Sequence, residues 1–466
     1  MLWACITLPH LALDGVLRRR PDDGPLVLVD GPAHARCIVA ANASAQAAGL
    51  HIGQRLTTAQ ALLTQFETIP YDAAAAERWQ RFLAGVAYRY SSQVALLPHA
   101  IVLEISRSQS LLGDWPKMER NLRSDLAALG FRHRIAAAPT PHAAHVLASV
   151  RDGQAVLTPE TMRRALDPVP LQKAHLPEQA TDALPRMGIR CLGQLLRMPR
   201  DGLQRRFGTP LLHAVDRLLG DMPAGLELYV PPDAVDWRIE LSHEVENIAA
   251  LVFPLKRMTG DLAAYLSGRD GGVQRFALRL EHRDRQATDV AVGMLAPERS
   301  ADVLFEAARG RLEQVQLPAP VLSLRLIADD LPGFVPAGRD LFDERPANAL
   351  PFEQLRERLR ARLGDHAVYR WGSTIDPRPE HSQRIAAPDE CFLEPRARPT
   401  WLLERPMPLH GVSRVLAGPE RVETGWWDGG DMRRDYYIVE TMHGQRAWAY
   451  CAPGERGGWM LHGWFA

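Results

Sequence analysis

Residues 236–330 carry an ordered series of strand and helix patterns, and this series restricts the possible folds more than any other feature. The order is strand, helix, strand, strand, helix, strand. Apolar residues recur at helical spacing in the first helix, and they alternate with charged residues in the second strand. These positions are Leu255, Met258, Leu262 and Leu266, then Phe276, Leu278 and Leu280 alternating with Arg275, Arg279 and Glu281. Residues 233–335 are therefore predicted to form a split βαβ sheet domain, with helices on one face and an open face that carries arginines.

Residues 1–165 alternate short apolar runs with helical segments, which predicts an α/β or α+β domain. The runs at 25–30 and 36–41 have strand character, and the segment 56–63 has helical character. Residues 166–232 follow with a helical pattern. The chain is thus expected to be a multidomain α+β protein, and its 466 residues suffice for two to four domains.

A glycine turn between two short helices, Met187-Gly188-Ile189, lies within the helical region. Such a turn lets the second helix present backbone N–H groups, which can hold a phosphate. The surrounding stretch 182–217 contains seven arginines and three acids. We therefore predict salt-sensitive phosphate contacts through Gly188, Arg190 and Arg197, independent of base sequence. The alternative is that these arginines are ordinary exposed helix charges.

The stretch 336–408 contains one amphipathic helix near 352–363, and a linker rich in proline and arginine is expected from about 376 to 408. Residues 409–466 then hold several tryptophans among short strand-like runs and glycines, which predicts a small β-rich module. Between positions 420 and 440 this module has six acids and three basic residues. That balance suits a protein partner, with Trp426 and Trp427 as anchors. Alternatively, the tryptophans build the core of a small domain.

The overall composition points to the reduced cytosol. The 55 basic residues cancel the 55 acidic ones, so a polyanion must be held by a local patch rather than by a global field. The five cysteines are odd in number and far apart, which argues against a disulfide framework and against a zinc cluster. The N-terminus lacks signal-peptide features, and no apolar run reaches the roughly 18 to 20 residues that span a bilayer. No membrane contact, metal or other cofactor is expected.

Several segments resemble the Y-family translesion DNA polymerases, and the resemblance covers essentially the whole chain. They are Ile38 to Leu50 with the following helix, Tyr90 to Ser106, Ala138 to Pro141, and the tail at 418–428 and 462–466. The tail is the most specific, because it recurs in the Y-family homologues of bacterial SOS mutagenesis cassettes and has no counterpart in ordinary Y-family polymerases. The resemblance implies a palm with inserted fingers (1–165), a helix-hairpin-helix thumb (166–232) and a DNA-binding little finger (233–335), in which Arg275 and Arg279 reach the DNA backbone.

Nucleotidyl transfer by such a palm needs carboxylates that hold two Mg²⁺ ions. The resemblance places the first-strand carboxylate at Thr7. It places the adjacent pair of carboxylates at His99 and Ala100 or, counted from Tyr90, at Ala100 and Ile101, and none of these residues can replace a carboxylate. Glu104 is expected to be a solvated or hairpin-pairing residue, since positions 99 and 104 face opposite sides of a strand. The resemblance therefore implies a palm that keeps its shape without its catalytic residues.

The residues that bind the nucleotide triphosphate in the family are also changed. The resemblance places Ala43 and Gln46 at a Tyr and an Arg of the fingers, and His145 at a phosphate-binding Lys. The lost positive charges predict a loss of affinity for Mg-nucleotide. His142 and His145 lie about one helical turn apart with no third ligand evident, so both are expected to be surface residues rather than metal ligands.

A short segment after the sheet domain, Asp340-Leu341-Phe342, matches three positions of the peptide that bacterial sliding clamps bind. The alternative is a hydrophobic plug against the domain surface. For the C-terminal module, the resemblance implies two protein partners: ImuA, which is a RecA-like protein, and an error-prone C-family DNA polymerase.

The combined prediction is a non-catalytic scaffold that binds damaged or primed DNA and the sliding clamp, and that recruits a mutagenic polymerase during DNA-damage tolerance. Such a protein is cytoplasmic and joins the nucleoid on DNA damage. The first alternative is an active translesion polymerase with displaced carboxylates. The second is a helix-hairpin-helix repair enzyme such as a glycosylase or nuclease, for which Lys173 is the only lysine close to the turn.

Overall fold

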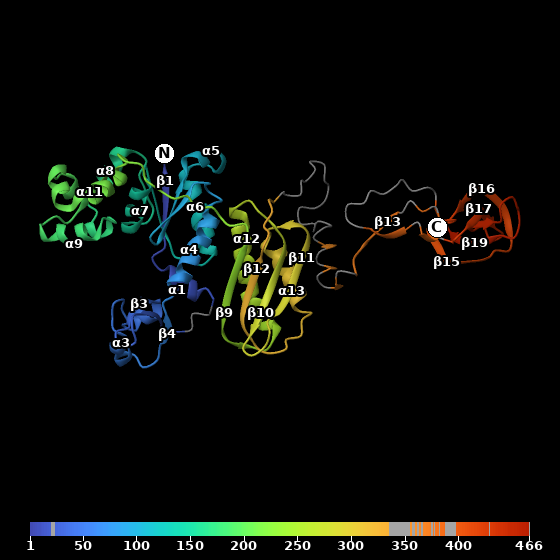
Figure 1. Cartoon of the computed structure of the whole chain (residues 1–466), viewed down its shortest axis with the longest axis horizontal. Coiled ribbons are helices and arrows are strands. Elements are labelled where there is room, and N and C mark those ends of the chain that lie inside the picture. Colours follow the sequence, from blue (N-terminus) through green and yellow to red (C-terminus); the bar gives the residue numbers. More distant parts are fainter. Residues whose placement is uncertain are drawn as a thin grey trace. The chain divides into compact units, whose positions relative to one another are not determined.

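The computed structural model describes residues 1–19, 24–334, 398–427 and 429–465, together with short stretches between 355 and 386. The chain divides into two compact units, residues 1–362 and 363–466 (Figure 1). The first unit mixes helices with three sheets, and the second contains β-strands and a short 3-10 helix, η3 (Pro379–His381). The predicted α+β multidomain fold is therefore confirmed.

The palm is built on a five-stranded sheet in the order β5-β6-β1-β7-β8. Its strands are β1 (Trp3–Thr7), β5 (Val94–Leu97), β6 (Ala100–Glu104), β7 (Arg134–Ala138) and β8 (Gln154–Ala155). Successive residues of a strand point to opposite faces, so Ala4 and Ile6 enter one hydrophobic core and Cys5 enters another. Helices α4 (Ala73–Ala87) and α6 (Trp115–Ala128) pack in the first core, and α7 (Pro141–Val150) packs in the second. Both faces of the palm sheet are thus covered. The short elements η1 (Ser106–Ser108) and α5 (Gln109–Leu112) follow β6.

The fingers form a small insertion with a hydrophobic core of their own. Strand β2 (Leu26–Asp30) pairs antiparallel with β3 (Cys37–Ala41) and parallel with β4 (Glu67–Pro70). Helices α2 (Ala43–Ala47) and α3 (Leu56–Leu62) complete the insertion, which α1 (Leu11–Leu17) connects to β1. The strands predicted at 25–30 and 36–41 and the helix predicted at 56–63 are confirmed.

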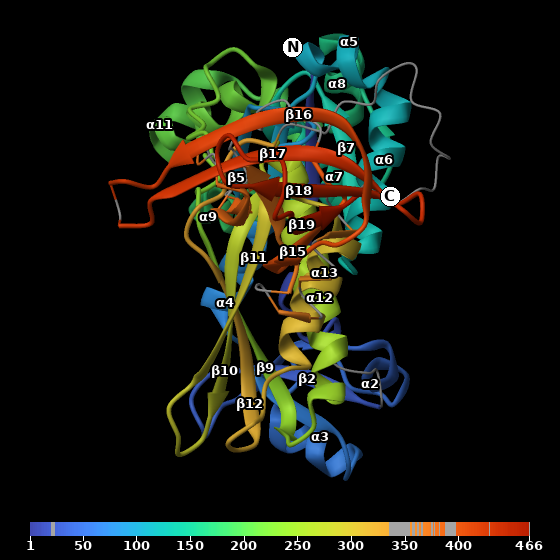
Figure 2. The ribbon, with the colours of Figure 1, turned by 90° about the vertical axis from the view of Figure 1, so that its right-hand side faces the viewer.

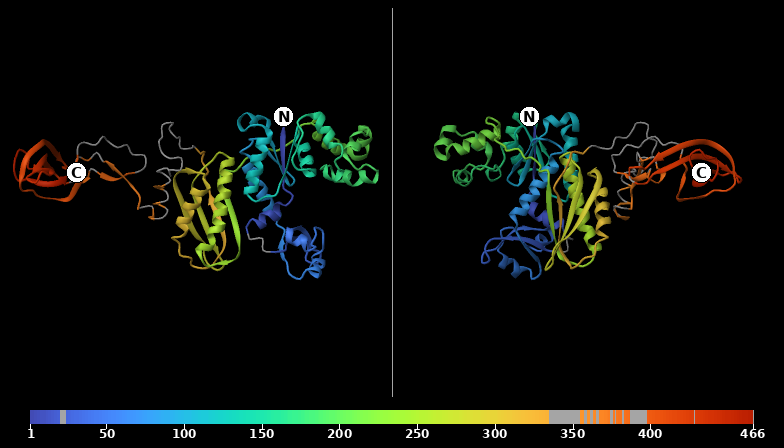
Figure 3. Two further views of the ribbon diagram at one scale, coloured as in Figure 1. Left: turned by 180° about the vertical axis from the view of Figure 1, so that it is seen from behind. Right: turned by 45° about the vertical axis from the view of Figure 1, so that its right-hand side comes forward.

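The thumb is helical, as predicted, and it shares its core with one face of the palm sheet. Its helices are α8 (Pro159–Leu166), the 3-10 helix η2 (Leu171–Lys173), α9 (Glu178–Arg186), α10 (Leu192–Leu196) and α11 (Arg200–Leu219), the last kinked at Gly208. Leu184, Leu192 and Leu195 are fully buried in the same cluster as Cys5 of the palm. Figure 3 shows the thumb and the fingers as separate lobes on the palm.

The little finger has the strand and helix order that the sequence predicts. Strands β9 (Val235–Val245), β10 (Val273–His282), β11 (Thr288–Glu298) and β12 (Val321–Ala328) form a sheet in the order β11-β10-β12-β9. Helices α12 (Ile248–Gly268) and α13 (Ala301–Leu312) lie side by side on one face of this sheet (Figure 2). Arg275 and Arg279 of β10 lie on the other face, which is open.

The little finger and the palm share one continuous hydrophobic core, in which α12 packs on α4. Two glycines permit the close approach: a Cβ on Gly268 would collide with the carbonyl oxygen of Gly85, and a Cβ on Gly85 would collide with the ring of Tyr265. The joint therefore resembles the interior of one domain more than a hinge between two.

A buried ion pair crosses this joint. Both terminal nitrogens of Arg18, which follows α1, donate to the carboxylate of Asp261 on α12 at 2.9 and 2.6 Å, and the Arg18 Nε donates to the carbonyl of Leu129. The side chains of Arg18 and Asp261 are 2% and 7% exposed. The Arg18 guanidinium also lies 4.7 Å from the ring centroids of Trp79 and of Phe131. The charged groups of this buried pair are thus hydrogen-bonded to one another across the joint.

The second unit contains a five-stranded antiparallel sheet in the order β15-β19-β18-β17-β16. Its strands are β15 (Trp401–Pro408), β16 (Val412–Thr424), β17 (Met432–Thr441), β18 (Arg446–Cys451) and β19 (Met460–Trp464). The ring of Tyr436 stacks on Trp448 with centroids 4.1 Å apart, and the Tyr436 hydroxyl hydrogen-bonds the buried His462. The predicted β-rich module is confirmed.

The segment 336–408 ends in a strand, although a linker is expected there. Strand β15 lies inside it and pairs with β19, because Trp401 and Leu402 lie opposite Trp464 and Gly463. A further hairpin, β13 (Arg370–Ser373) with β14 (Gln383–Ala386), also falls within it. The last strand of the module, β19, thus pairs with residues that the sequence composition assigns to a linker. In the part of the chain that the structure describes, no helix is long and apolar enough to cross a membrane.

Removing one partner of the buried ion pair should destabilise the first unit strongly. For Asp261→Leu we expect a loss of about 3–5 kcal/mol in the free energy of unfolding, because a buried guanidinium then lacks its counter-charge. The double variant Arg18→Met/Asp261→Leu should be more stable than Asp261→Leu alone. Urea unfolding followed by tryptophan fluorescence measures both. As a control, Glu313→Gln breaks the exposed Arg309–Glu313 pair and should cost less than about 1 kcal/mol. Equal losses in Asp261→Leu and Glu313→Gln would contradict the role of the ion pair.

Candidate functional site

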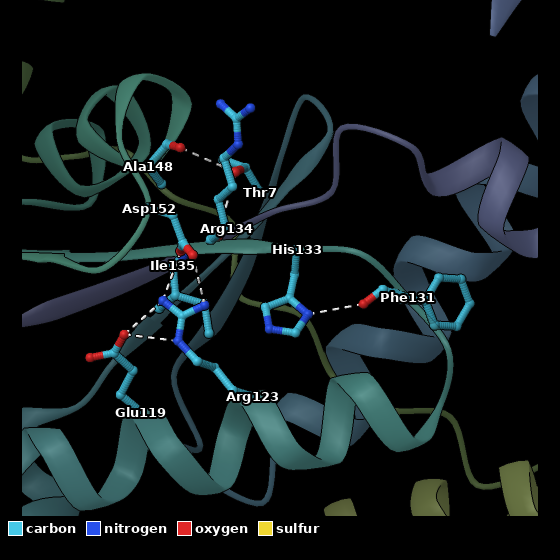
Figure 4. Close-up of polar contacts among 9 residues, drawn as sticks. All are labelled: Thr7, Glu119, Arg123, Phe131, His133, Arg134, Ile135, Ala148 and Asp152. Atoms are coloured by element: carbon cyan, nitrogen blue, oxygen red, sulfur yellow. Dashed lines mark hydrogen bonds and ion pairs between the residues drawn. The ribbon is translucent and has the colours of Figure 1, made fainter. Parts of the chain in front are cut away.

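Thr7, at the end of β1, lies in the middle of a row of three residues that crosses the palm sheet. Its neighbour on β6 is Ala100 and its neighbour on β7 is Arg134. The Thr7 hydroxyl lies 3.4 Å from the carbonyl of Arg134 and 3.5 Å from the carbonyl of Ala148 on α7, and it donates toward these oxygens (Figure 4). Thr7 is buried and Ala100 is fully buried. The sheet thus brings together Thr7 and Ala100, two of the three positions at which the sequence analysis expects lost carboxylates.

The third position, His99, occupies the turn between β5 and β6. It has a positive φ of 54°, and its carbonyl accepts a hydrogen bond from the amide of Leu8, the residue after Thr7. His99 itself is exposed. Thr7, His99 and Ala100 therefore meet at one edge of the palm sheet, and none of the three side chains carries a carboxylate.

Glu104 lies at the opposite end of β6, paired with Trp3. Of the two expected roles, solvated or hairpin-pairing, the solvated one is wrong, because Glu104 is 1% exposed and its amide donates to the carbonyl of Gln93 beside the β5–β6 hairpin. Its carboxylate accepts hydrogen bonds from the amide of Ser106 at 3.0 Å and from the Ser106 hydroxyl, and so holds the start of η1. Four residues of strand place Glu104 about 13 Å along the strand from Ala100. Its role is structural, and it is too far from Thr7 to share a metal ion with that edge.

Asp152, whose carboxylate is hydrogen-bonded to β7, is already paired with an arginine. Both of its carboxylate oxygens accept from Arg123, at 2.7 and 3.1 Å, and one also accepts from the amide of Ile135 (Figure 4). Burial raises the pKa of Asp152, but the hydrogen bonds from Arg123 and Ile135 outweigh it and hold the pKa below its usual value. Glu119 shares the same guanidinium. Both oxygens of the Asp152 carboxylate are thus already hydrogen-bonded to Arg123.

Histidines and arginines surround this edge of the palm. Burial lowers the pKa of His10, and the cations of Arg132 and Arg134 lower it further. In the described residues no group of three or more His, Cys, Asp or Glu side chains could hold a metal ion. Arg132 in turn pairs with the buried carboxylate of Asp14 at 2.6 Å, so this acid is also held by an arginine.

His145 is buried, which corrects the expectation that it is a surface residue. Its ring stacks on that of His175 of the thumb with centroids 3.9 Å apart, and His175 also hydrogen-bonds Ser149 of α7. Burial lowers the pKa of His145 to about 3, with smaller contributions from His175, His142 and His99. A neutral imidazole packed between palm and thumb cannot supply the charge of a phosphate-binding lysine. In the fingers, the side chain of Gln46 donates to the carbonyl of Ala41 instead of facing a ligand.

The glycine turn of the thumb has the expected conformation. Gly188 has a φ of 83° and lies in open space, and Arg190 and Arg197 are exposed. However, the amides of residues 187–189 donate to carbonyls of α9, and those of Arg190 and Cys191 donate to the side chain of Gln194. The backbone donors are thus already used. A phosphate contact at this turn depends on arginine side chains rather than on the amides.

The predicted little-finger arginines differ in their surroundings. Arg275 is exposed. Arg279 donates twice to the carboxylate of Asp289, at 2.7 and 2.9 Å. The structure adds two arginines that the sequence analysis misses: Arg325 on β12 lies directly opposite Arg279, and Arg238 on β9 lies directly opposite Arg325. Their outward alternation is visible in the sequence, but the register that aligns them is not.

In the second unit, Trp426 and Trp427 lie in the turn between β16 and β17 and are 78% and 56% exposed. Trp448 is buried in the module core. The tryptophans therefore divide between the two predicted roles, core and free surface. The predicted clamp-binding residues Asp340, Leu341 and Phe342 lie outside the described residues.

Comparisons with known proteins agree with these features. A sequence model of the impB/mucB/samB family matches residues 14–149. Protein ImuB from two strains of Caulobacter vibrioides, NA1000 / CB15N and ATCC 19089, is 28% identical over 461 residues, covering 90% of this chain and 100% of the relative. Among solved structures, a Y-family DNA polymerase chimera has a TM-score of 0.42 and 13% identity, covering 71% of this chain and 98% of that chain. DinB from Sulfolobus solfataricus has a TM-score of 0.39 and 13% identity, covering 72% and 100%.

The chain is similar to ImuB along most of its length. The resemblance inferred from the tail and the palm is confirmed, and the chain is a polymerase-like protein. The segment that matches the impB/mucB/samB family begins after Thr7 and includes His99 and Ala100.

Replacing His145 with Gln should flatten the dependence of thermal stability on pH between about pH 6.5 and pH 3. The pKa of His145 is about 3 in the folded protein and near 6.5 in the unfolded chain. As the pH falls through this window the unfolded chain binds a proton that the folded protein does not, so the wild type loses stability. Unfolding midpoints measured from pH 7 to pH 4 test this. His213→Gln, an exposed site on α11, is the control. An unchanged pH dependence in His145→Gln would show that the buried ring does not matter.

Proposed function

We propose that this chain is a non-catalytic scaffold for translesion synthesis and mutagenesis induced by DNA damage, as part of the SOS response. It binds damaged or primed DNA, the sliding clamp, the RecA-like protein ImuA and an error-prone C-family DNA polymerase. It works in the cytoplasm, at the nucleoid after damage. The proposal rests on the similarity to ImuB and on the residues that occupy the catalytic edge of the palm.

One observation carries the non-catalytic part: Thr7 and Ala100 lie directly opposite each other at the edge where a two-metal polymerase needs carboxylates. The nearby acids support the same reading, since Asp152 is paired with Arg123 and Glu104 caps η1. Two-metal catalysis needs ligands on both ions. The alternative, an active polymerase with displaced carboxylates, requires a cluster of free acids at this edge.

DNA binding is supported by the thumb. Among the seven arginines of the stretch 182–217, six are exposed: Arg186, Arg190, Arg197, Arg200, Arg205 and Arg206. Arg197 lies 3.4 Å from Asp167, and both side chains of this pair are more than half exposed, so the pairing is weak and open to exchange. Exposed arginines around a glycine turn suit backbone phosphates of any sequence. A helix-hairpin-helix repair enzyme would instead need a catalytic lysine in a pocket, and Lys173 is exposed on η2.

Protein binding is supported by the second unit. Large aromatic side chains are costly to leave in water unless they serve an interface. Trp426 and Trp427 lie with ring centroids 5.6 Å apart in one turn. We propose this pair as the anchor for ImuA or the C-family polymerase, and Asp340-Leu341-Phe342 as the segment that the sliding clamp binds.

The central test is whether the full-length protein binds primed DNA without extending the primer. We expect no nucleotide incorporation with Mg²⁺ or Mn²⁺, and binding that weakens with salt in fluorescence anisotropy. Arg190→Gln and Arg197→Gln should each weaken binding to DNA of any sequence. Each should also reduce the salt slope, which is the change in the logarithm of the binding constant with the logarithm of the salt concentration, by about one. Arg309→Gln, an arginine of α13 that already pairs with Glu313, is the matched control and should bind like the wild type. Primer extension by the purified protein would overturn the non-catalytic reading.

Replacing both Trp426 and Trp427 with Ala should abolish capture of the purified C-family polymerase or of ImuA and leave DNA affinity unchanged. Truncating an aromatic anchor typically lowers affinity at least about 30-fold. The unfolding midpoint should stay within about 2 °C of wild type, because both side chains are exposed. Trp448→Ala is the contrasting variant, since it removes a buried core residue and should unfold the module. Undiminished capture by the double variant would remove these residues from the interface.

A further inference from the structure

Three arginines form a straight row across the open face of the little-finger sheet. Arg279 on β10, Arg325 on β12 and Arg238 on β9 are direct neighbours in the strand register, and Asp289 on β11 ends the row. Like charges directly opposite one another destabilise a sheet. Stability alone would therefore favour alternating signs within the row, and the repeated arginine points to a ligand.

Carboxylates neutralise every arginine of this row. Arg279 pairs with Asp289, Arg325 pairs with Asp236, and Arg238 donates to Glu281 at 2.7 Å and to Glu240 at 2.6 Å. The hydroxyl of Ser323 also donates to Glu281, from the residue directly opposite on β12. The hydrogen bonds from the arginines lower the pKa of Asp236 and of Asp289, so both acids stay ionised at neutral pH. The row and its partners thus comprise three cations and four anions.

These ion pairs are open to exchange. Side-chain exposure within them lies between 27% and 73%, and exposed pairs contribute little to stability. A phosphate can therefore take an arginine from its carboxylate at small cost. The released carboxylate then lies beside the phosphate and repels it, so each acid weakens the binding of a polyanion.

The shape of the face fits an extended phosphate backbone. Strands in a sheet lie about 4.8 Å apart, so the row spans roughly 10 Å, comparable to the distance along the helix axis between the first and last of about four successive phosphates of one DNA strand. In the neighbouring row the small residues Ala277 and Ala291 are followed by Ile327, and Gly293 lies opposite Arg275, so small residues border Arg279 on the side of β10 and β11. At β9 the row meets a cleft of about 470 Å³, which Arg19 and Arg78 of the palm also line. The Nε of Arg19 is buried and has no hydrogen-bond partner.

We propose that Asp289, Asp236 and Glu281 are specificity-determining residues of this face. They hold the arginine row neutral in the free protein and so limit its affinity for a DNA backbone. The little finger then binds phosphates weakly by itself and contributes once the thumb has placed the DNA on it. The inference rests on the DNA binding proposed above, and it adds the regulation of that surface.

The test compares isosteric variants of the acids in the full-length protein, with binding to primed DNA followed by fluorescence anisotropy across a salt series. Asp289→Asn and Asp236→Asn should each tighten binding about two- to fivefold at low salt, and their combination should tighten it more. The salt slope should steepen by about 0.9 for each additional phosphate contact. Glu313→Gln on α13 makes the same change in net charge on the helical side of the domain and is the matched control. Arg279→Gln in the Asp289→Asn background should reverse the gain.

The outcomes separate the two proposals. If the wild type binds DNA and the two Asn variants do not differ from Glu313→Gln, the proposal that the acids limit the affinity of the arginine row is disproved. The proposed DNA binding then still stands. If the wild type binds barely and the Asn variants bind well, the carboxylates are shown to limit the face. If no variant binds, both proposals fail. Thermal unfolding midpoints close to wild type confirm that the variants keep the fold.

Discussion

The buried pair of Arg18 and Asp261 is the interaction on which the first unit depends. It joins the segment after α1 to α12 of the little finger, and it is hydrogen-bonded by both terminal nitrogens of the guanidinium. A buried charge pair contributes little net stability compared with apolar residues, but it is costly to break. Its effect is therefore specificity: α12 packs on α4 at one position, where Gly85 and Gly268 come into contact. The open face of the little-finger sheet then has a fixed relation to the palm.

On the proposed function, the palm keeps its fold without the carboxylates that catalysis requires. The sheet needs small or apolar residues at Thr7 and Ala100, because α7 and the thumb cover that face. A carboxylate buried there without a metal ion would carry an uncompensated charge. On the proposed function, Thr and Ala are the more stable choices at a palm without catalysis, and the buried ring of His145 packs between palm and thumb. On the proposed function, the palm remains because it holds thumb and little finger together.

Much of this architecture could be predicted from the sequence, because it depends on local periodicity. The alternation at Phe276, Leu278 and Leu280 predicted both the strand and the open arginine face, and the helical spacing from Leu255 to Leu266 predicted α12. Long-range relations could not be read this way. Glu104 was expected to be solvated or to pair in the hairpin, and only the packing of β6 shows that it is buried. Strand β15 was assigned to a linker, since nothing local indicates that it pairs with β19 more than fifty residues later. The arginine row likewise depends on register, to which Arg238 and Arg325 give no local clue.

The overall charge balance has a different meaning in each part of the chain. In the stretch 182–217 of the thumb, seven arginines outnumber three acids, so a local positive charge is available to a polyanion. In the little finger the arginines are more regularly arranged, yet each of the three in the row has a carboxylate partner. A free arginine attracts DNA before contact, whereas a paired one exchanges its partner only at contact range, because opposite charges cancel beyond their own separation. The two surfaces are thus suited to successive steps: the thumb to capture any duplex, and the little finger to hold only a backbone that already lies along the sheet.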